Sequence, residues 1–312
     1  MNLHESTHQF PTSRTLVIFS EPLHSSEIIF KEEPIRFSQS ILKHLAGHWK
    51  LQLQSKQQDL TELGISSIIK SFSANIKVPL DALFVNDKPV MWPGQCITLR
   101  DWQIEDHSAK LLVNEISYPF IAALGDIEFV KQISKENLPA LRPPLAICTF
   151  AITTDNFLVL TVRGNATPVY PGRFYGQGGN PDSSKINILH HQLEEMKEEI
   201  LIESNEVIAE SMKFFGIIED EETFPGKPDL IGTVKVFLSS KEVKKRFDSR
   251  SLEARPADVS DIRFIQFDKE SLFHFLKNET QPKDFCPPAY GGLMLVGLFQ
   301  FGNEWLKESV TI

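Results

Sequence analysis

The segment between residues 157 and 201 constrains the possible fold more than any other part of the chain. Phe157–Val162 has the composition of a strand, and a loop rich in Gly, Pro and Tyr follows from Gly164 to Ser184. A helix is then expected from about Ile186 to Leu201, because apolar residues recur there at helical spacing. A strand, a glycine-rich loop and a helix in this order favour a mixed α/β architecture.

Further strands and short helices surround this segment. We expect strands at Ala146–Ile152, Phe214–Ile218, Leu230–Leu238 and Ile262–Phe267, a hairpin turn at Thr153–Asn156, and short helices at Lys241–Phe247 and Lys269–Lys277. The long helix does not alternate with single strands as in βαβ units. We therefore predict an α/β fold of the α+β type, an α/β/α sandwich around a mixed sheet.

The length of the chain predicts two domains. It has 312 residues, about twice a typical domain length, and the proline-dense run Leu138–Pro144 marks a boundary. We expect a smaller N-terminal α+β domain of unknown role over 1–137 and a second domain over 138–312. The first half is expected to contain strands at Thr15–Phe19, Ile28–Phe30, Leu80–Val85, Cys96–Ile104 and Leu111–Ile116, and helices at Phe37–Leu53 and Leu60–Phe72.

The composition excludes several classes of function. A net charge of −9 argues against general nucleic-acid binding, which needs a basic surface, although a bound metal ion would still allow a small anionic substrate. The 3 cysteines are widely spaced, which disfavours a disulfide framework or a thiolate zinc site. No apolar run approaches the roughly 18–20 residues of a membrane span, and the first residues do not resemble a signal peptide. We expect a cytoplasmic monomer or homodimer.

The expected helix has two different faces. Its apolar stripe would pack on the sheet and consists of Leu189, Leu193, Met196 and Ile200. Glu195, Glu198 and Glu199 share another stripe, with His191 at its edge. Like charges at i,i+4 disfavour a helix by about 0.2–0.5 kcal/mol per pair, whereas a divalent ion prefers such converging oxygen ligands. A solvated acidic face is the alternative interpretation.

The loop before the helix favours the metal interpretation. Gly172, Gly176, Gly178 and Gly179 lie within eight residues of one another, so backbone amides there could approach a bound ligand closely. A glycine turn that leads into a helix is also a plausible anion cradle. Diphosphate oxygens and a metal ion could therefore meet where this loop joins the acidic helix.

Gly178-Gly179 followed by the run from Glu194 to Ile202 resembles the Nudix box. The resemblance implies that Glu195, Glu198 and Glu199 bind Mg²⁺ or Mn²⁺ against a nucleoside-diphosphate bridge. Three positions depart from the family pattern, whose arginine, glycine and upstream glutamate are replaced by Glu194, Leu201 and Ile186.

One Nudix branch, which splits UDP-glucose and UDP-galactose into UMP and sugar 1-phosphate, is similar over more of the chain. The similar segments are Leu141–Gly164, Gly178–Asp182, Phe215–Ile217 and Phe285–Ala289. This resemblance implies a diphosphatase for a small nucleotide-sugar. Two alternatives stay open, namely a catalytically degenerate Nudix fold that binds nucleotides or regulates, and a hydrolase of ADP-ribose or a dinucleotide.

Several residues are candidates for other roles in such a reaction. The proton of the attacking water could pass to Glu199, to Glu198, to a member of the run Glu219–Glu222, or to Asp229. The run could equally be a solvated loop. The expected substrate-binding residues are Arg163 and Arg173 for phosphates, Tyr175 for base stacking, Lys227, and the backbone of Gly178 and Gly179. Surface arginines paired with nearby acids are the alternative for the two arginines.

Overall fold

The structure is a computed structural model. It describes residues 8–33, 84–85, 88–89, 95–117, 131, 143–165, 167, 169–183, 185–222, 226–250 and 258–310. The helices predicted at Phe37–Leu53 and Leu60–Phe72 lie outside these residues. The strand predicted at Leu80–Val85 is described only at Phe84–Val85, which is β3 and pairs with β4 (Lys88–Pro89).

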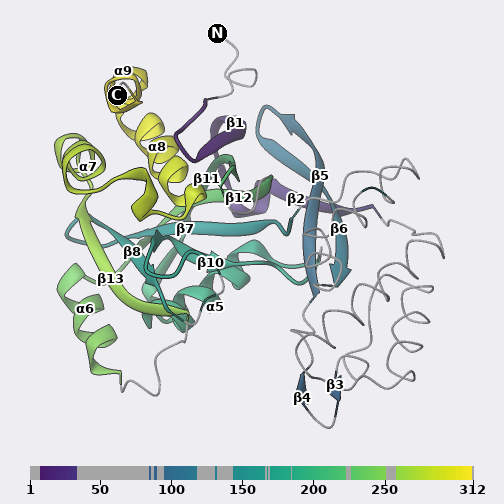
Figure 1. The fold of residues 1–312 in the computed structure, drawn as a ribbon, viewed down its shortest axis with the longest axis horizontal. Helices are drawn as coiled ribbons and strands as arrows, with labels where there is room; N and C mark the ends of the chain where they lie inside the picture. Colours follow the sequence, from purple (N-terminus) through teal and green to yellow (C-terminus); the bar gives the residue numbers. More distant parts are fainter. Residues whose placement is uncertain are drawn as a thin grey trace.

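A large mixed sheet forms the centre of the described part of the chain (Figure 1). Its strands are β1 (Ser13–His24), β7 (Ala146–Ile152), β8 (Phe157–Arg163), β9 (Phe174–Tyr175), β10 (Gln177–Gly179), β11 (Val207–Asp220), β12 (Lys227–Val236) and β13 (Val259–Gln266). The strand order is β1-β11-β12-β7-β8-β13, with β10 paired to β7 and β9 paired to β8. Only the β12–β7 pair among these is parallel, so the predicted mixed sheet is confirmed.

Helices cover both faces of this sheet. They are α5 (Ile188–Ile200), α6 (Ser240–Ser249), α7 (Lys269–His274), α8 (Pro287–Phe301) and α9 (Asn303–Val310). Short turns complete the set: 3-10 turns at Ser25–Glu27, Ser204–Glu206 and Pro282–Asp284, and a π-helical turn at Phe275–Glu279. Figure 1 shows α5 and α6 on one side of β7 and α8 with α9 on the other. The architecture is therefore the predicted α/β/α sandwich.

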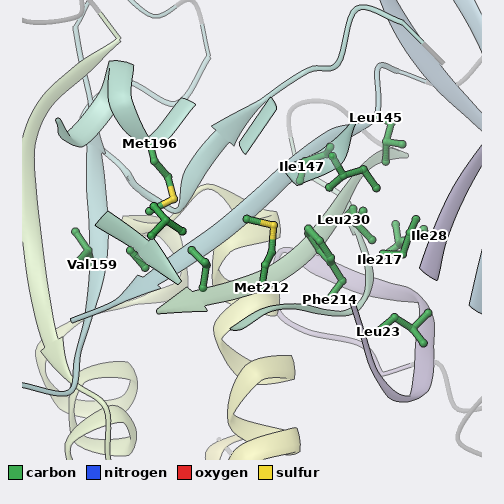
Figure 2. Close-up of a cluster of buried hydrophobic side chains, with 14 of the residues drawn as sticks. Leu23, Ile28, Leu145, Ile147, Val159, Met196, Met212, Phe214, Ile217 and Leu230 are labelled. Atoms are coloured by element: carbon green, nitrogen blue, oxygen red, sulfur yellow. The ribbon is translucent and has the colours of Figure 1, made fainter. Parts of the chain in front are cut away.

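Two apolar clusters hold the layers together. On β7, Ile147 and Ala151 pack in the cluster that contains α5 and α6, while Cys148 and Phe150 pack in the cluster that contains α7, α8 and α9. Figure 2 shows part of the first cluster, where Met196 of α5 lies near strand residues. Because β7 is covered on both faces, all its residues are buried and all except Thr149 are apolar.

A second, three-stranded sheet lies against the first cluster. It consists of β2 (Ile28–Glu32), β6 (Ser108–Ser117) and β5 (Gln95–Glu105), in that order. Two backbone hydrogen bonds tie β5 to the second half of the chain: Ile97 N–H donates to Pro181 O at 3.1 Å, and Leu145 N–H donates to Ile97 O at 2.9 Å. The loop that precedes α5 is thus held to β5 through Pro181.

Strand β1 belongs to the large sheet although it comes from the first half of the chain. It pairs antiparallel with β11, with Ser13 opposite Asp220 and Thr15 opposite Ile218. The strand predicted at Thr15–Phe19 is therefore present and is an edge strand of the central sheet. The division of the chain at residue 137 stays a prediction, but the sheet itself is built from both sides of that point.

Helix α8 was not among the predicted elements. Of its 15 residues, 12 are buried, so it lacks the polar face that gives an amphipathic period. It also begins with Pro287-Pro288 and contains three glycines, which are typical of loops in a single sequence. Within the part of the chain that the structure describes, no helix is both long and apolar enough to cross a membrane.

Candidate active site on helix α5

Helix α5 is fixed in place by its cap and its apolar face. The side chain of Asn187 accepts a hydrogen bond from His190 N–H at 3.1 Å, which satisfies one of the unpaired amides at the helix start. Met196 and Ile200 are buried in the first cluster, and Leu189 and Leu193 pack against it half-buried. The predicted apolar stripe therefore faces the sheet, and this sets where the acidic stripe lies.

The helix ends at Leu201 in a left-handed conformation, with φ 61° and ψ 33°. In the sequence resemblance to the Nudix box, this position corresponds to the family glycine, and a side chain there costs about 1 kcal/mol in this conformation. The guanidinium of Arg250 donates to Glu198 O at 2.9 Å and to Lys197 O at 3.3 Å. Arg250 thus satisfies carbonyl groups that the helix end leaves unpaired.

The three predicted metal ligands differ in burial. Glu199 is 6% exposed and Glu195 is half-buried, whereas Glu198 is exposed. Burial raises the pKa of Glu195 to about 7, with a further contribution from the charge of Glu198. Burial, and then the charge of Glu195, raise the pKa of Glu199 well above its usual value. A solvated face describes Glu198 but not the other two.

The glycine strand β10 lies directly over these two glutamates. Gly178 N–H donates to Glu199 Oε2 at 3.1 Å. A Cβ on Gly179 would lie 2.3 Å from Glu195 Oε1, and a Cβ on Gly178 would lie 1.8 Å from Ile147 O. At Gly178 the contact is with backbone, so only glycine fits between β7 and the acidic helix, whereas a side chain at Gly179 would displace the Glu195 carboxylate.

His191 borders the same group. Its Nε2 lies 3.7 Å from Glu195 Oε1 and 3.5 Å from Gly179 O. The ring is 8% exposed, and burial lowers the pKa of His191, so the neutral imidazole is favoured. The charge of Glu195 is therefore not balanced by an imidazolium.

These donors fit a divalent ion that keeps part of its hydration shell. Over the described ranges, no three His, Cys, Asp or Glu side chains are arranged so that they could enclose a metal ion. Buried Glu199 and half-buried Glu195 do lie together, and the charge of Glu195 raises the pKa of Glu199. Mg²⁺ is commonly held by one or two carboxylates with water and substrate phosphates, and this pair suits that mode of binding.

Arg163 is the predicted phosphate-binding cation that lies close to this pair. Its charge lowers the pKa of Glu199, against the larger effect of burial. The guanidinium stands 5.7 Å from the ring centre of Tyr175, and its Nε donates to Val169 O at 3.1 Å. These contacts leave its terminal nitrogens without a carboxylate partner among the described residues, so they are suited to an anionic ligand.

The other predicted cations pair with carboxylates on β12 and just after β11, in an arrangement that we name the paired-carboxylate cluster. It contains Asp220, Glu222 and Asp229 with their partners Tyr170, Arg173, Tyr175 and Lys227. Arg173 binds both carboxylate oxygens of Glu222 at 2.8 Å, and its guanidinium stands 4.7 Å from the Tyr170 ring centre.

The centre of this cluster is Asp229, which is fully buried. It accepts a hydrogen bond from Tyr175 Oη and forms an ion pair with Lys227. Tyr175, Lys227 and Arg173 are therefore engaged within the protein, as the alternative for Arg173 anticipated. The proposed base candidates Glu219 and Asp220 are also engaged, by Arg14 at 2.7 Å and by Tyr170 at 2.6 Å.

Two residues that the sequence did not single out belong to the site. The charge of Asp258 raises the pKa of both Glu195 and Glu199. Its backbone carbonyl accepts from Gly164 N–H at 2.7 Å, next to Arg163. Gln192 of α5 is fully buried beside β10. Neither lies in a recognisable sequence motif. Asp258 is far from α5 in the sequence, and Gln192 contacts residues of β7 and β10, which are distant from it in the sequence.

No protein-family model matches this chain, and no curated protein matches it. Solved structures with some similarity include a Deinococcus radiodurans protein, DR0079, at 15% identity, covering 43% of this chain and 74% of that one, with a TM-score of 0.29. Another is the Bacillus subtilis pyrophosphohydrolase BsRppH, at 14% identity, 53% and 81% coverage and a TM-score of 0.32.

A third similar structure is a Francisella tularensis bifunctional NMN adenylyltransferase/ADP ribose pyrophosphatase, solved with AMP and an Mn ion. It is 15% identical, with a TM-score of 0.35, and covers 59% of this chain. This chain spans 50% of the length of that enzyme. TM-scores of this size do not establish a family, so we base the function on the geometry of the α5 site.

Proposed function

We propose that this protein is a Nudix-type diphosphatase that needs a divalent ion, Mg²⁺ or Mn²⁺. The observation that carries the proposal is the pair of glutamates on α5, of which Glu199 is buried and Glu195 is half-buried. Glu195 and Glu199 lie under the glycine strand β10, and no Lys or Arg in the described part of the chain forms an ion pair with either. Placing two carboxylates in a buried position without a cation is costly unless a ligand supplies the charge.

Each group has a definite task in such a reaction. Glu195 and Glu199 would hold the ion, and exposed Glu198 would complete its ligands from the solvent side. The ion would supply charge neutralisation for a diphosphate and a more acidic water. Arg163 offers free guanidinium donors to phosphate oxygens beside this pair. The amides of the glycine loop lie close enough to the helix to add further donors.

The paired-carboxylate cluster would form the wall of the substrate site. Its ion pairs fix Tyr175, Lys227 and Arg173 relative to Arg163, so these side chains need little reorganisation on binding. Because Arg173 and Lys227 are already paired, we assign them to shaping the site and Arg163 to direct phosphate contact.

The substrate that we propose is a UDP-sugar, cleaved to UMP and sugar 1-phosphate. This choice rests on the sequence resemblance over roughly residues 138–300 to the branch that splits UDP-glucose and UDP-galactose. The test is incubation with Mg²⁺ or Mn²⁺ and separate UDP-sugars, ADP-ribose and dinucleotides, with detection of nucleoside monophosphate. We expect UMP from UDP-glucose or UDP-galactose.

The same panel decides between the alternatives. Turnover of ADP-ribose or a dinucleotide in place of UDP-sugars would keep the chemistry and change the substrate. Absence of turnover with every divalent ion would overturn the enzyme proposal and leave a nucleotide-binding module. Glu198→Gln separates the roles of the glutamates, because its exposed carboxylate is expected to matter less than that of Glu199.

A further inference from the structure

Gln192 is a buried polar residue that the proposed chemistry leaves without a role. It lies on the face of α5 turned toward the glycine strand and is fully buried. Its Nε2 donates to Thr149 Oγ1 of β7 at 2.8 Å and to Gln177 O of β10 at 2.7 Å. A carbonyl oxygen can only accept, so the Gln177 contact fixes the orientation of the Gln192 amide. Its Oε1 has no hydrogen-bond partner among the residues that the structure describes.

The peptide group between Gln177 and Gly178 is held from both of its ends by α5. Its carbonyl accepts from Gln192, and its N–H donates to Glu199 Oε2 at 3.1 Å. The two helix residues are seven positions apart, which is about two turns, so they share one face. The carbonyl of this peptide is therefore anchored by the Gln192 amide, and its N–H points at Glu199, a proposed metal ligand.

An anchor is needed because the peptide adjoins glycines. Gly178 has φ 150°, a value that glycine adopts easily, and Gly179 follows it. The side chain of Gln177 is already fixed, since it accepts from Ala151 N–H at 2.8 Å and donates to Val159 O at 2.8 Å. Rotation of the peptide plane is the remaining freedom, and the Gln192 hydrogen bond opposes it.

We propose that Gln192 is a positioning residue of the α5 site. Its amide holds the Gln177–Gly178 peptide so that Gly178 N–H binds Glu199 Oε2 and turns that carboxylate toward the ion. The inference rests on the proposed function, because it takes Glu199 as a metal ligand. Groups that orient ligands in this way typically change metal affinity by about 10–100-fold when they are mutated.

The first experiment measures Mn²⁺ affinity of the full chain by isothermal titration calorimetry. Gln192→Met keeps the length of the side chain and removes both donors, and we expect Mn²⁺ binding about 10–100-fold weaker. Thr149→Val is the matched control, because it removes the other acceptor of Gln192 and leaves the Gln177 contact. We expect that control to stay within about threefold of the wild type, while unchanged Mn²⁺ binding in Gln192→Met would overturn the inference.

A double-mutant cycle separates positioning from a general structural effect. In a Glu199→Gln background, Gln192→Met should cause no further loss of Mn²⁺ affinity, because the carboxylate through which it acts is gone. Equal losses in the two backgrounds would show that Gln192 supports the fold only, and would overturn the proposal.

A metal-free measurement keeps the inference distinct from the proposed function. The Gly178 amide proton, hydrogen-bonded to a carboxylate, should shift upfield in the NMR spectrum of Gln192→Met and stay in place in Thr149→Val. A wild-type protein that binds no Mn²⁺ would refute the metal site alone, whereas an unmoved Gly178 resonance would refute the role of Gln192. If Gln192→Met does not fold, Gln192→Asn, whose amide is one methylene shorter, replaces it in the same comparison.

Discussion

Two groups of carboxylates in this molecule differ in how the protein satisfies them. In the paired-carboxylate cluster, buried Asp229 has Lys227 and Tyr175, buried Asp220 has Tyr170, and exposed Glu222 has Arg173. On α5, Glu199 is buried and Glu195 is half-buried, neither forms an ion pair with a Lys or Arg of the described residues, and burial raises the pKa of both. The two groups lie on segments that one sheet brings together, so burial alone does not explain the difference.

The difference indicates which group is complete in the folded chain. A buried carboxylate with its own cation and hydrogen-bond donors is satisfied by the protein, and removing a partner is what destabilises it. A buried pair without a cation is satisfied only by a proton or by a bound cation. Four substitutions or titrations can test this contrast, and we order them from the largest expected effect to the smallest.

The largest effect is expected from Glu199→Gln. It removes one charge of the α5 pair and keeps an oxygen that can accept from Gly178 N–H. We expect hydrolysis of the accepted substrate to fall by about 10³-fold, which corresponds to roughly 4 kcal/mol of transition-state stabilisation. Glu194→Gln makes the same charge change on the exposed side of α5 and should leave the rate within about threefold. Equal rates for the two variants would contradict the assignment.

The second effect is on the pH dependence of stability without metal. The pKa of Glu195 in the folded protein is about 7, against an ordinary 4.5. The folded state therefore binds the proton more tightly, and unfolding free energy should fall by about 3 kcal/mol as pH rises from below 4.5 through 7. Urea unfolding at several pH values measures this, with Glu195→Gln as the reference.

Two further measurements of the free energy of unfolding against pH test whether Glu195 is the titrating group. Saturating Mn²⁺ should remove most of the fall, because the ion replaces the proton. A Glu195→Gln protein whose stability depends on pH as the wild type does would show that this glutamate is not the titrating group.

The third effect tests the ion pair at the centre of the paired-carboxylate cluster. Lys227→Met leaves Asp229 fully buried, with Tyr175 as its remaining side-chain partner among the described residues. Because breaking a buried pair costs about 3–5 kcal/mol and Lys227 is partly exposed, we expect a loss near 3 kcal/mol in urea unfolding. Lys235→Met on the exposed side of β12 is the control and should change stability by less than about 0.5 kcal/mol. Similar losses in both variants would mean that the pair is not the cause.

The smallest effect concerns Leu201 at the end of α5. It tests whether the left-handed backbone there is strained. Leu201 adopts φ 61°, so Leu201→Gly relieves about 1 kcal/mol of backbone cost while losing half-buried apolar contacts. Leu201→Ala loses similar contacts and keeps the cost. We expect the glycine variant to be about 1 kcal/mol more stable than the alanine variant in thermal unfolding. Equal stability would remove the strain argument.

Periodicity in the sequence was sufficient to predict α5, its apolar stripe and the strands that flank it. The helical spacing put Glu195 and Glu199 on one stripe, but spacing cannot show that a glycine strand lies over that stripe and buries it. Helix α8 escaped prediction because it is apolar on all sides and carries prolines and glycines. Periodicity reports a contrast between two faces, and this helix has none.

The partners of the site were beyond prediction for a different reason. Gln192 makes its contacts 15 and 43 positions earlier in the chain, so no local pattern carries the information. Arg173 and Lys227 are ordinary cations in the sequence, and only the fold shows that each meets an acid. Site residues were thus predictable where one helix holds them and unpredictable where several strands converge.

The pairing of β1 with β11 has a consequence for how the chain folds during synthesis. Ser13 lies opposite Asp220, so the first edge strand waits for more than 200 further residues before its partner exists. At typical translation rates of about 5–20 residues per second, that wait lasts roughly 10–40 s. During this time Val17, Phe19 and Leu23, which are buried in the finished protein, have no sheet to join. The emerging N-terminal segment is therefore the part of this protein that we expect molecular chaperones to bind.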